Sequence, residues 1–206
     1  MAIPLSNDPD RSLIEACQEN PAKGLDGSFR EMYEVYRDRV YSVCFRITGN
    51  ATDALDASQE TFGILFRKIE GFRFESRFSS WVYRIAVNTS IDLKRRSKSR
   101  ASTSLEALHA DNGAGENSVD FRDEVTEAPA DVASRHELED EVQRAILRLS
   151  EKMRAITVLR YLQGQSYGEI AETLKISLGT VKSRLARAHH ALDRELTDVI
   201  DNHFLS

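Results

Sequence analysis

The sequence contains little of what many common folds and sites require. Its two cysteines, Cys17 and Cys44, have no CxxC spacing and no histidine at ligand spacing, so neither a disulfide framework nor a metal site is expected. Four prolines and ten glycines are few for a β-rich fold with many tight turns. Cys44 falls on an apolar helix face, where a small buried side chain is expected.

Signals for membranes and secretion are also missing. No apolar run approaches the roughly 20 residues that span a bilayer. The N-terminus lacks the basic start and apolar block of a signal peptide. We therefore expect a cytoplasmic protein with no membrane insertion.

No catalytic constellation can be defended in the sequence. There is no Ser/His/Asp or Cys/His set, no paired carboxylate site and no glycine loop for phosphate. His189 and His190 have no partner at helical spacing, and we expect them to be solvated surface residues. The chain is therefore not expected to be an enzyme or to hold a cofactor or metal.

Helix signals, by contrast, are abundant. Apolar residues recur at spacings of three and four through much of the chain, which predicts an all-α fold. In the first half, helices are expected over about 9–19, 28–48, 52–69 and 80–96. Capping boxes are predicted at three pairs: Ser28/Glu31, Ser134/Glu137 and Ser166/Glu169. Ser150 and Ser177 are expected to cap two further helices.

The composition changes abruptly in the middle of the chain. Residues 106–133 contain eight acidic residues and a single arginine, with little apolar periodicity. Burial in such a segment cannot offset the entropy of ordering it. We therefore predict two small helical domains, 1–100 and 134–206, joined by an acidic flexible linker over 101–133.

The second domain contains SYGEIAETLKISLGTVKSRLARAHHAL (166–192), which predicts a helix-turn-helix. Its second helix has an apolar face for packing and an outer face that suits the DNA major groove. The candidate DNA-binding residues are Thr180, Lys182, Ser183, Arg184 and Arg187. The alternative is an ordinary surface helix with a solvated basic face.

The first domain has a second candidate site. Phe72, Phe74 and Phe78 alternate with Arg73 and Arg77. This combination suits unstacked bases and their phosphates, although Phe74 and Phe78 could equally belong to the core.

The polar face of the third predicted helix has two interpretations. It carries Asp53, Asp56, Gln59 and Glu60. Such a face is either solvated or a surface for a partner.

Together, three segments resemble the extracytoplasmic-function group of the sigma-70 family. The segments are ITGNATDALDASQETF, FRFESRFSSWVYRIAVNTSIDLKRR and LRYLQGQSYGEIAETLKISLGTVKSRLARAHHAL. The resemblance covers about residues 25–100 and 135–200. It implies an initiation factor that binds core RNA polymerase and directs it to promoter DNA. It also implies an anti-sigma factor as a further partner.

The resemblance also implies roles for individual residues. Those implied to dock on the β′ clamp of polymerase are Asp53, Asp56, Gln59, Glu60 and Phe62, while the second domain would meet the β flap. Those implied at the −10 element are Phe72, Arg73, Ser76, Asn88, Arg95 and Arg96. Lys182, Ser183 and Arg187 would face the −35 element, with Thr180 and Arg184 nearer phosphates.

Some positions depart from the family pattern. Leu55 and Ala57 stand where Glu and Leu are usual, which removes one possible acidic contact with polymerase. Lys175 occupies a turn position often given to glycine, so a less tight turn is expected. By analogy with the family, the acidic linker could mimic a polyanion in polymerase channels.

A free-standing helix-turn-helix regulator is the main alternative. Its first domain would sense a signal or dimerise, and it would bind its operator without polymerase. Such a protein would not require the DxxDxxQETF and SSWVYRIAVN segments. An anti-sigma or scaffolding protein is disfavoured, because the chain lacks a zinc-ligand cluster.

Overall fold

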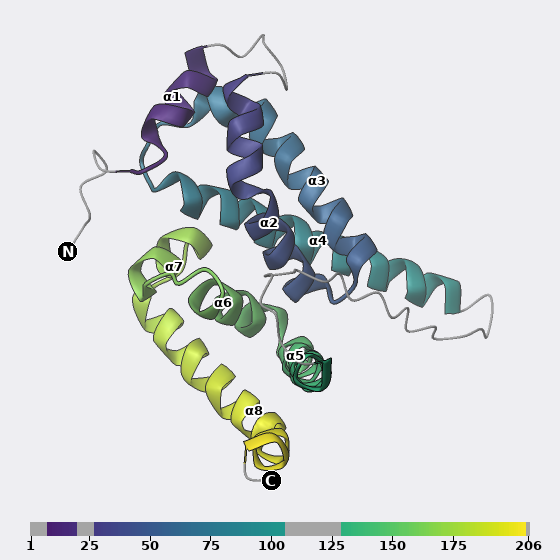
Figure 1. Ribbon diagram of the computed structural model, residues 1–206. Helices are drawn as coiled ribbons and strands as arrows, with labels where there is room; N and C mark the ends of the chain where they lie inside the picture. Colours follow the sequence, from purple (N-terminus) through teal and green to yellow (C-terminus); the bar gives the residue numbers. More distant parts are fainter. Residues whose placement is uncertain (1–7, 20–26, 106–128, 205–206) are drawn as a thin grey trace.

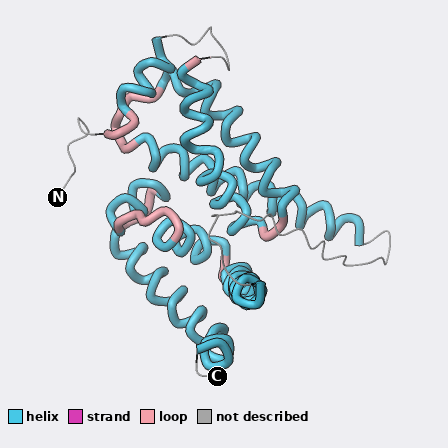
Figure 2. The backbone as a smooth tube through the Cα atoms, viewed as in Figure 1, coloured by secondary structure: helices cyan, strands magenta, loops and turns pink. Residues whose placement is uncertain are grey.

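The computed structural model describes residues 8–19, 27–105 and 129–204, and all regular structure within these ranges is helical (Figures 1 and 2). The elements are α1 (Arg11–Glu19), α2 (Ser28–Thr48), α3 (Ala51–Lys68), a 3₁₀ turn η3 (Ile69–Gly71), α4 (Phe78–Leu105), α5 (Pro129–Arg148), α6 (Glu151–Tyr161), α7 (Tyr167–Leu174) and α8 (Leu178–Phe204). The prediction of an all-α fold is therefore confirmed.

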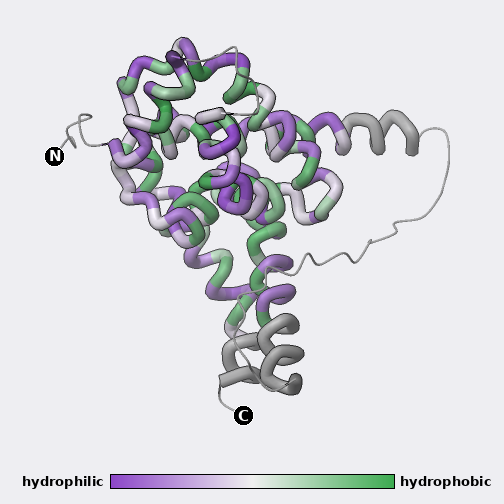
Figure 3. Tube along the Cα trace, turned by 45° about the horizontal axis from the view of Figure 1, so that its top comes forward, coloured by the Kyte–Doolittle hydropathy of each residue, from purple (hydrophilic) through white to green (hydrophobic). Residues whose placement is uncertain are grey.

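Helices α1 to α4 pack around one set of apolar side chains. α2 lies against both α3 and α4, and α1 lies against α2 and η3. Hydrophobic and hydrophilic residues alternate along these helices (Figure 3), and the buried apolar side chains recur along them. The largest side chains that this half buries completely are Tyr36, Phe78, Ile14, Met32, Ile47 and Leu65.

Helices α5 to α8 form the second group. α8 packs along α5, α6 and α7, and its apolar residues Val181, Leu185 and Ala188 are buried there. They meet Ile156, Leu159 and Ile170 from α6 and α7 in the same core. This packing fixes which side of α8 remains exposed.

The two groups touch each other. α2 contacts α5 and α6, and α4 contacts α6 and α7 (Figure 1). Their buried apolar side chains form one continuous cluster, whereas the sequence suggested two separate small cores. The contact follows from apolar side chains that each group alone would leave exposed.

The helix boundaries differ from the prediction at three places. α2 has Gly27 as its N-cap with no side-chain capping bond, so the Ser28/Glu31 box is wrong. Ser134 lies inside α5, which starts at Pro129, and it cannot cap that helix. Proline suits the first turn of a helix because its missing N–H would be unpaired there. Ser150 precedes α6 but makes no side-chain capping bond.

Two other predicted helix ends agree with the structure, whereas α4 runs past its predicted end. Gly49 ends α2 with φ of 87°, and Ser166 and Glu169 form the predicted capping box of α7. α4 starts at Phe78 and continues to Leu105, beyond the predicted end near residue 96. Residues 106–128, most of the predicted linker, lie outside the described residues.

Both cysteines are buried. Cys17 and Cys44 are 4% and 0% exposed, so the expected burial of Cys44 is confirmed. Burial raises the pKa of each thiol to about 11. Neither side chain is therefore poised as a thiolate at neutral pH.

Candidate nucleic-acid and partner interfaces

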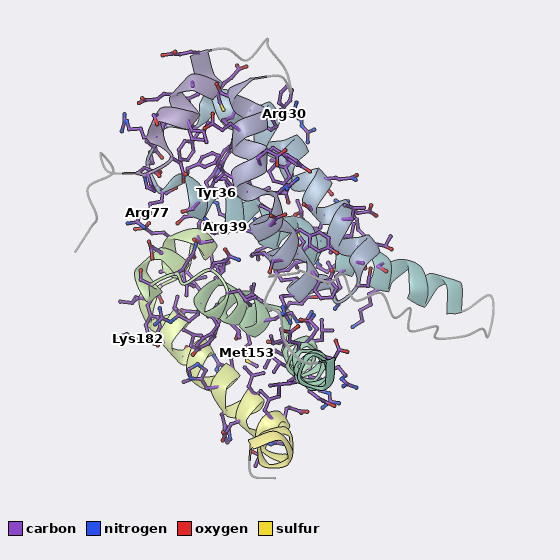
Figure 4. The ribbon with its side chains drawn as sticks, in the orientation of Figure 1. Arg30, Tyr36, Arg39, Arg77, Met153 and Lys182 are labelled. Carbon is purple, nitrogen blue, oxygen red and sulfur yellow. The ribbon has the colours of Figure 1, made fainter. Side chains whose placement is uncertain are left out.

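The first three turns of α8 carry the predicted recognition residues. Ser177 caps the helix, because its Oγ accepts the Thr180 N–H at 3.1 Å. Lys182, Ser183 and Arg187 are exposed, and Thr180 and Arg184 are partly buried. Figure 4 shows Lys182 on the side of α8 that faces away from α5 and α6. The packing of α8 thus brings the five predicted residues onto one end of the helix.

Several of these side chains already bond along the helix. The Ser183 hydroxyl donates to the Thr180 carbonyl at 3.1 Å, and Arg187 Nε donates to the Ser183 carbonyl at 3.2 Å. These bonds are exposed to solvent, so they can be exchanged for bonds to a base edge or phosphate at small cost. The surface is preformed in shape and adaptable in its hydrogen bonding.

The turn before α8 is tighter than expected. Lys175 adopts the left-handed conformation with φ of 52° and ψ of 49°. The Ile176 N–H donates to the Ala171 carbonyl at 3.0 Å, which closes the end of α7. The expectation of a looser turn is therefore wrong, because the backbone accepts strain at Lys175 to keep the bond.

The loop of residues 72–77 forms an aromatic cluster with the start of α4. Phe72 stacks on Trp81, with ring centroids 5.0 Å apart and an interplanar angle of 28°. The Phe72 ring also makes edge-to-face contacts with Phe74 and Phe78, with ring centroids 5.0 Å and 5.4 Å apart. Phe78 is fully buried and Phe74 partly so, which matches the core interpretation for Phe78. Phe72 is also partly buried.

The other predicted −10 residues lie in the same loop or along α4. Arg73 is exposed and Ser76 partly buried in the loop. Asn88 is exposed seven residues after Trp81, which places the two on one face of α4, about 10 Å apart. Arg95 and Arg96 are exposed further along the helix, with Arg95 3.8 Å from Asp92. Asn88 and Arg95 are seven residues apart, so they share one face of α4.

The N-terminal helix α1 contacts this loop, which sequence reasoning missed. Gln18 Nε2 donates to the carbonyls of Ile69 at 2.9 Å and Phe72 at 2.8 Å. Asp8 Oδ2 accepts the N–H of Phe78 at 2.7 Å, at the start of α4. No local sequence signal reveals these contacts, since the partners are more than 50 residues apart in the chain.

The acidic face of α3 is exposed at its predicted positions, with one exception. Asp56, Gln59 and Glu60 are exposed, and Asp53 is partly buried. Phe62 is only 7% exposed, and its ring packs edge-to-face with Tyr33, with ring centroids 4.7 Å apart. It therefore supports the helix from the core side and presents little surface of its own to a partner.

Two structural details shape the same face. Asn50 caps α3, because its Oδ1 accepts the Asp53 N–H at 2.7 Å and its Nδ2 donates to the Asp53 carboxylate at 2.7 Å. This cap is a signal that sequence reasoning overlooked. Leu55 is 51% exposed beside the acidic residues, so the departure from the family pattern puts an apolar side chain on that surface.

A buried arginine links the two groups of helices. Arg154 of α6 is 4% exposed and donates from Nη1 to the Ile47 carbonyl at the end of α2, at 2.6 Å. Its other nitrogens donate to the carbonyls of Ile146, Leu147 and Leu149. Cations favour the carbonyl ends of helices, and here one guanidinium serves the ends of both α2 and α5.

Further contacts lie along the seam between helices α1 to α4 and helices α5 to α8. Arg46 Nη1 of α2 donates to the Gln143 Oε1 of α5 at 2.9 Å. Within the first group, Lys94 Nζ of α4 donates to the Thr48 carbonyl of α2 at 3.1 Å. Burial, followed by the nearby Arg154 charge, lowers the pKa of Lys94. At the other end, Arg77 of the aromatic loop forms an ion pair with Glu169 of α7 at 2.8 Å (Figure 4).

The histidines of α8 differ from one another. His190 is exposed, as expected. His189 is exposed but not free, because its Nε2 bonds the Tyr161 hydroxyl and the two rings lie 5.6 Å apart.

The described helices include none long and apolar enough to cross a membrane.

Comparisons with known proteins match both halves of the chain. The model of sigma-70 region 2 matches residues 32–100, and that of sigma-70 region 4 matches residues 139–191. Over 179 residues the chain is 35% identical to the ECF RNA polymerase sigma factor SigW of Bacillus subtilis, covering 86% of this chain and 93% of SigW. It is 33% identical over 192 residues to the ECF RNA polymerase sigma-E factor of Escherichia coli K12, covering 93% and 96%.

Solved structures share the fold. The sigma factor RpoE of Bartonella quintana, solved with the anti-sigma factor NepR, aligns with a TM-score of 0.61 at 20% identity, over 82% of this chain and 96% of that one. CnrH, solved with the cytosolic domain of CnrY, aligns with a TM-score of 0.63 at 24% identity, over 93% and 99%. With both family regions matched in order on the helices that carry the predicted DNA-binding residues and the aromatic loop, the chain belongs to the extracytoplasmic-function group of the sigma-70 family.

Proposed function

We propose that the chain is an alternative sigma factor that binds core RNA polymerase, recognises the −10 and −35 promoter elements and promotes opening of the DNA. The observation that carries this proposal is the presence of two different DNA-suited surfaces on one chain. The exposed start of α8 suits duplex DNA, and the Phe72 stack suits unpaired bases. An operator-binding regulator needs the first surface but has no use for the second.

At the −10 element, contacts with the protein replace the stacking of a base on its neighbours in the DNA. Extracting a base costs a few kcal/mol, and a prepared pocket offsets part of that cost. Phe72 is already stacked on Trp81 and is only partly buried, while Arg73 and Ser76 beside it supply hydrogen-bond donors. Asn88 continues the contact along α4, and Arg95 and Arg96 meet the DNA backbone. Because binding energy opens the DNA, the factor is not an enzyme.

At the −35 element, the start of α8 enters the major groove of intact duplex. Lys182 and Arg187 donate to base edges, and Ser183 accepts or donates as the sequence requires. Thr180 and Arg184 are partly buried and contact phosphates, which fix the position of the helix without reading sequence.

Partner surfaces complete the proposal. The acidic face of α3, with Asp53, Asp56, Gln59 and Glu60, docks on the β′ clamp of core polymerase, and Phe62 supports it from beneath. The second domain meets the β flap. An anti-sigma factor is the expected regulator, as in the solved RpoE complex with NepR. This activity places the chain in the cytoplasm.

Run-off transcription with core polymerase tests the proposal. The chain and core together should initiate at discrete start sites, and neither should do so alone. Sequencing those start sites would give the promoter elements. Sequence-specific binding of an operator by the chain, without affinity for core polymerase, would show instead a free-standing helix-turn-helix regulator.

A further inference from the structure

The loop that carries Phe72 cannot hold its own shape. Residues 72–77 lie between η3 and α4, and they contain no regular hydrogen-bonded structure. Backbone groups in such a loop need partners from elsewhere in the chain. Within the described residues, Gln18 of α1 bonds the Phe72 carbonyl, and Gln18 and Asp8 bond the backbone on either side of the loop, at Ile69 and Phe78.

Gln18 holds the entry to the loop. Its carboxamide Nε2 donates to two carbonyls, those of Ile69 at 2.9 Å and Phe72 at 2.8 Å. The Phe72 carbonyl belongs to the residue whose ring stacks on Trp81. One side chain from α1 therefore bonds the backbone on both sides of Gly71, including that of Phe72 itself.

Asp8 holds the exit from the loop. Its Oδ2 accepts the N–H of Phe78, the first residue of α4, at 2.7 Å. The first N–H groups of a helix lack intrahelical partners, and a carboxylate there also favours the helix dipole. Asp8 is 7% exposed and lies 70 residues before its partner, so it acts as a remote cap of α4.

Arg11 holds the middle of the loop. Its guanidinium carbon lies 4.6 Å from the centroid of the Phe74 ring. Phe74 has φ of 54°, a left-handed conformation that is rare for a bulky residue. Such strain persists only where the surroundings enforce it, and it concentrates at functional sites.

The helix that makes these contacts is itself anchored. Ile14 and Cys17 of α1 are buried in the core, and the Tyr36 hydroxyl bonds the Asp10 carboxylate. α1 is thus a fixed support with one buried face. It precedes the sigma-70 region 2 match, which begins at residue 32.

From this geometry we propose that Asp8, Arg11 and Gln18 are positioning residues for the −10 element: they hold the Phe72 loop in the shape that receives an unpaired base. They act through the loop and need not touch DNA themselves. The inference rests on the proposed function, since it assigns α1 to the same site.

Two variants test the role of Gln18, one near-isosteric and one that keeps a donor. Gln18→Glu turns a donor into an acceptor facing two carbonyls, whereas Gln18→Lys keeps a donor. The probe is a single-stranded oligonucleotide with the −10 sequence of a promoter mapped by run-off transcription. We expect Gln18→Glu to weaken its binding to the holoenzyme by about tenfold, and Gln18→Lys to stay within about threefold. Ser12→Ala, at an exposed position on α1, is the matched control.

Arg11→Ala supplies a milder test of the same loop. It removes the cation–π contact with Phe74 and an exposed ion pair with Glu15, but leaves the buried face of α1 intact. We expect a two- to fivefold loss of binding to the same oligonucleotide. All variants should keep the wild-type affinity for core polymerase and for duplex −35 DNA, which separates loop positioning from general stability.

A second readout does not depend on DNA. Trp81 is the single tryptophan of the chain and stacks on Phe72, so its quenching by acrylamide reports the order of the loop in the free protein. Gln18→Glu should increase quenching, and Ser12→Ala should not. Unchanged quenching and unchanged oligonucleotide binding in Gln18→Glu would overturn the proposal, as would an equal loss of core affinity.

The two proposals fail in different ways. If the wild-type holoenzyme shows no preference for the −10 strand, the proposed function fails. The quenching measurement then still decides whether α1 positions the loop.

Discussion

Side chains at the start of α8 differ in the hydrogen bonds that they make within the helix in the absence of DNA. Lys182 points outward from α8, whereas Arg187 is bonded through Nε to the Ser183 carbonyl. The Arg187 bond leaves the terminal guanidinium nitrogens available as a fork, the geometry that suits guanine edges. Arg187 is therefore the residue from which a base-specific effect is most strongly expected.

Arg187→Ala should weaken binding to the cognate promoter by about 1–3 kcal/mol and relax preference at one −35 position. The physical reason is the loss of paired donors to a single base. Holoenzyme binding to a panel of single-base −35 variants would measure this, with Arg194→Ala, exposed two turns further along α8, as the control. An equal loss on every promoter variant would reassign Arg187 to a phosphate.

At the scale of elements, the helix-turn-helix depends on a strained connection. Lys175 ends α7 in the left-handed conformation, which costs a non-glycine residue about 1–2 kcal/mol. Its N–H and that of Ile176 nevertheless donate to carbonyls of α7 and close the helix end. The angle between α7 and α8 therefore relies on a conformation that lysine does not prefer.

Lys175→Gly should stabilise the chain by about 1 kcal/mol, because glycine adopts the left-handed conformation without steric cost. For a chain of this length the melting temperature should rise by about 2–4 °C. Lys175→Ala is the control, since it removes the same exposed side chain but keeps the Cβ. If Lys175→Ala and Lys175→Gly raise the melting temperature equally, the lysine side chain rather than its left-handed backbone is what destabilises the chain.

Sequence patterns predicted elements well where the signal is local. The apolar spacing of Val181, Leu185 and Ala188 placed the packed side of α8, and the Ser166 capping box placed the start of α7. Prediction failed where the cause is distant. Nothing near Gln18 in the sequence points to the Phe72 carbonyl, and Arg154 resembles a solvated helix residue although it bonds the end of α2.

On the scale of the whole molecule, the seam between the two groups of helices limits how far apart the two DNA-binding segments can lie. The ion pair of Arg77 and Glu169 joins the aromatic loop to α7. From Glu169 to Arg187, two helical stretches and one turn span at most about 35 Å, and the ion pair with the loop back to Phe72 adds at most about 30 Å, so Phe72 and Arg187 lie within about 65 Å. The −10 and −35 elements are about 25 base pairs apart by their names, or about 85 Å. The groups must therefore separate when both elements are bound.

Glu169→Gln should shift the free chain toward separated groups. Glu169 uses one carboxylate oxygen for the ion pair with Arg77 and the other for the capping bond to the Ser166 N–H. Glutamine can keep the cap but loses the charge, and a partly exposed ion pair contributes up to about 1 kcal/mol. Ser166→Ala is the complementary control, because it weakens the cap and keeps the pair.

Energy transfer between dyes at Lys68→Cys and Arg194→Cys would measure the separation, since both positions are exposed and the native thiols are buried. We expect longer distances in Glu169→Gln than in the parent or in Ser166→Ala, and the difference should shrink as salt screens the ion pair. Adding core polymerase and promoter DNA should bring all three proteins to the same extended distance. A parent protein that remains compact on promoter DNA would contradict the separation, because the packed arrangement cannot span both elements.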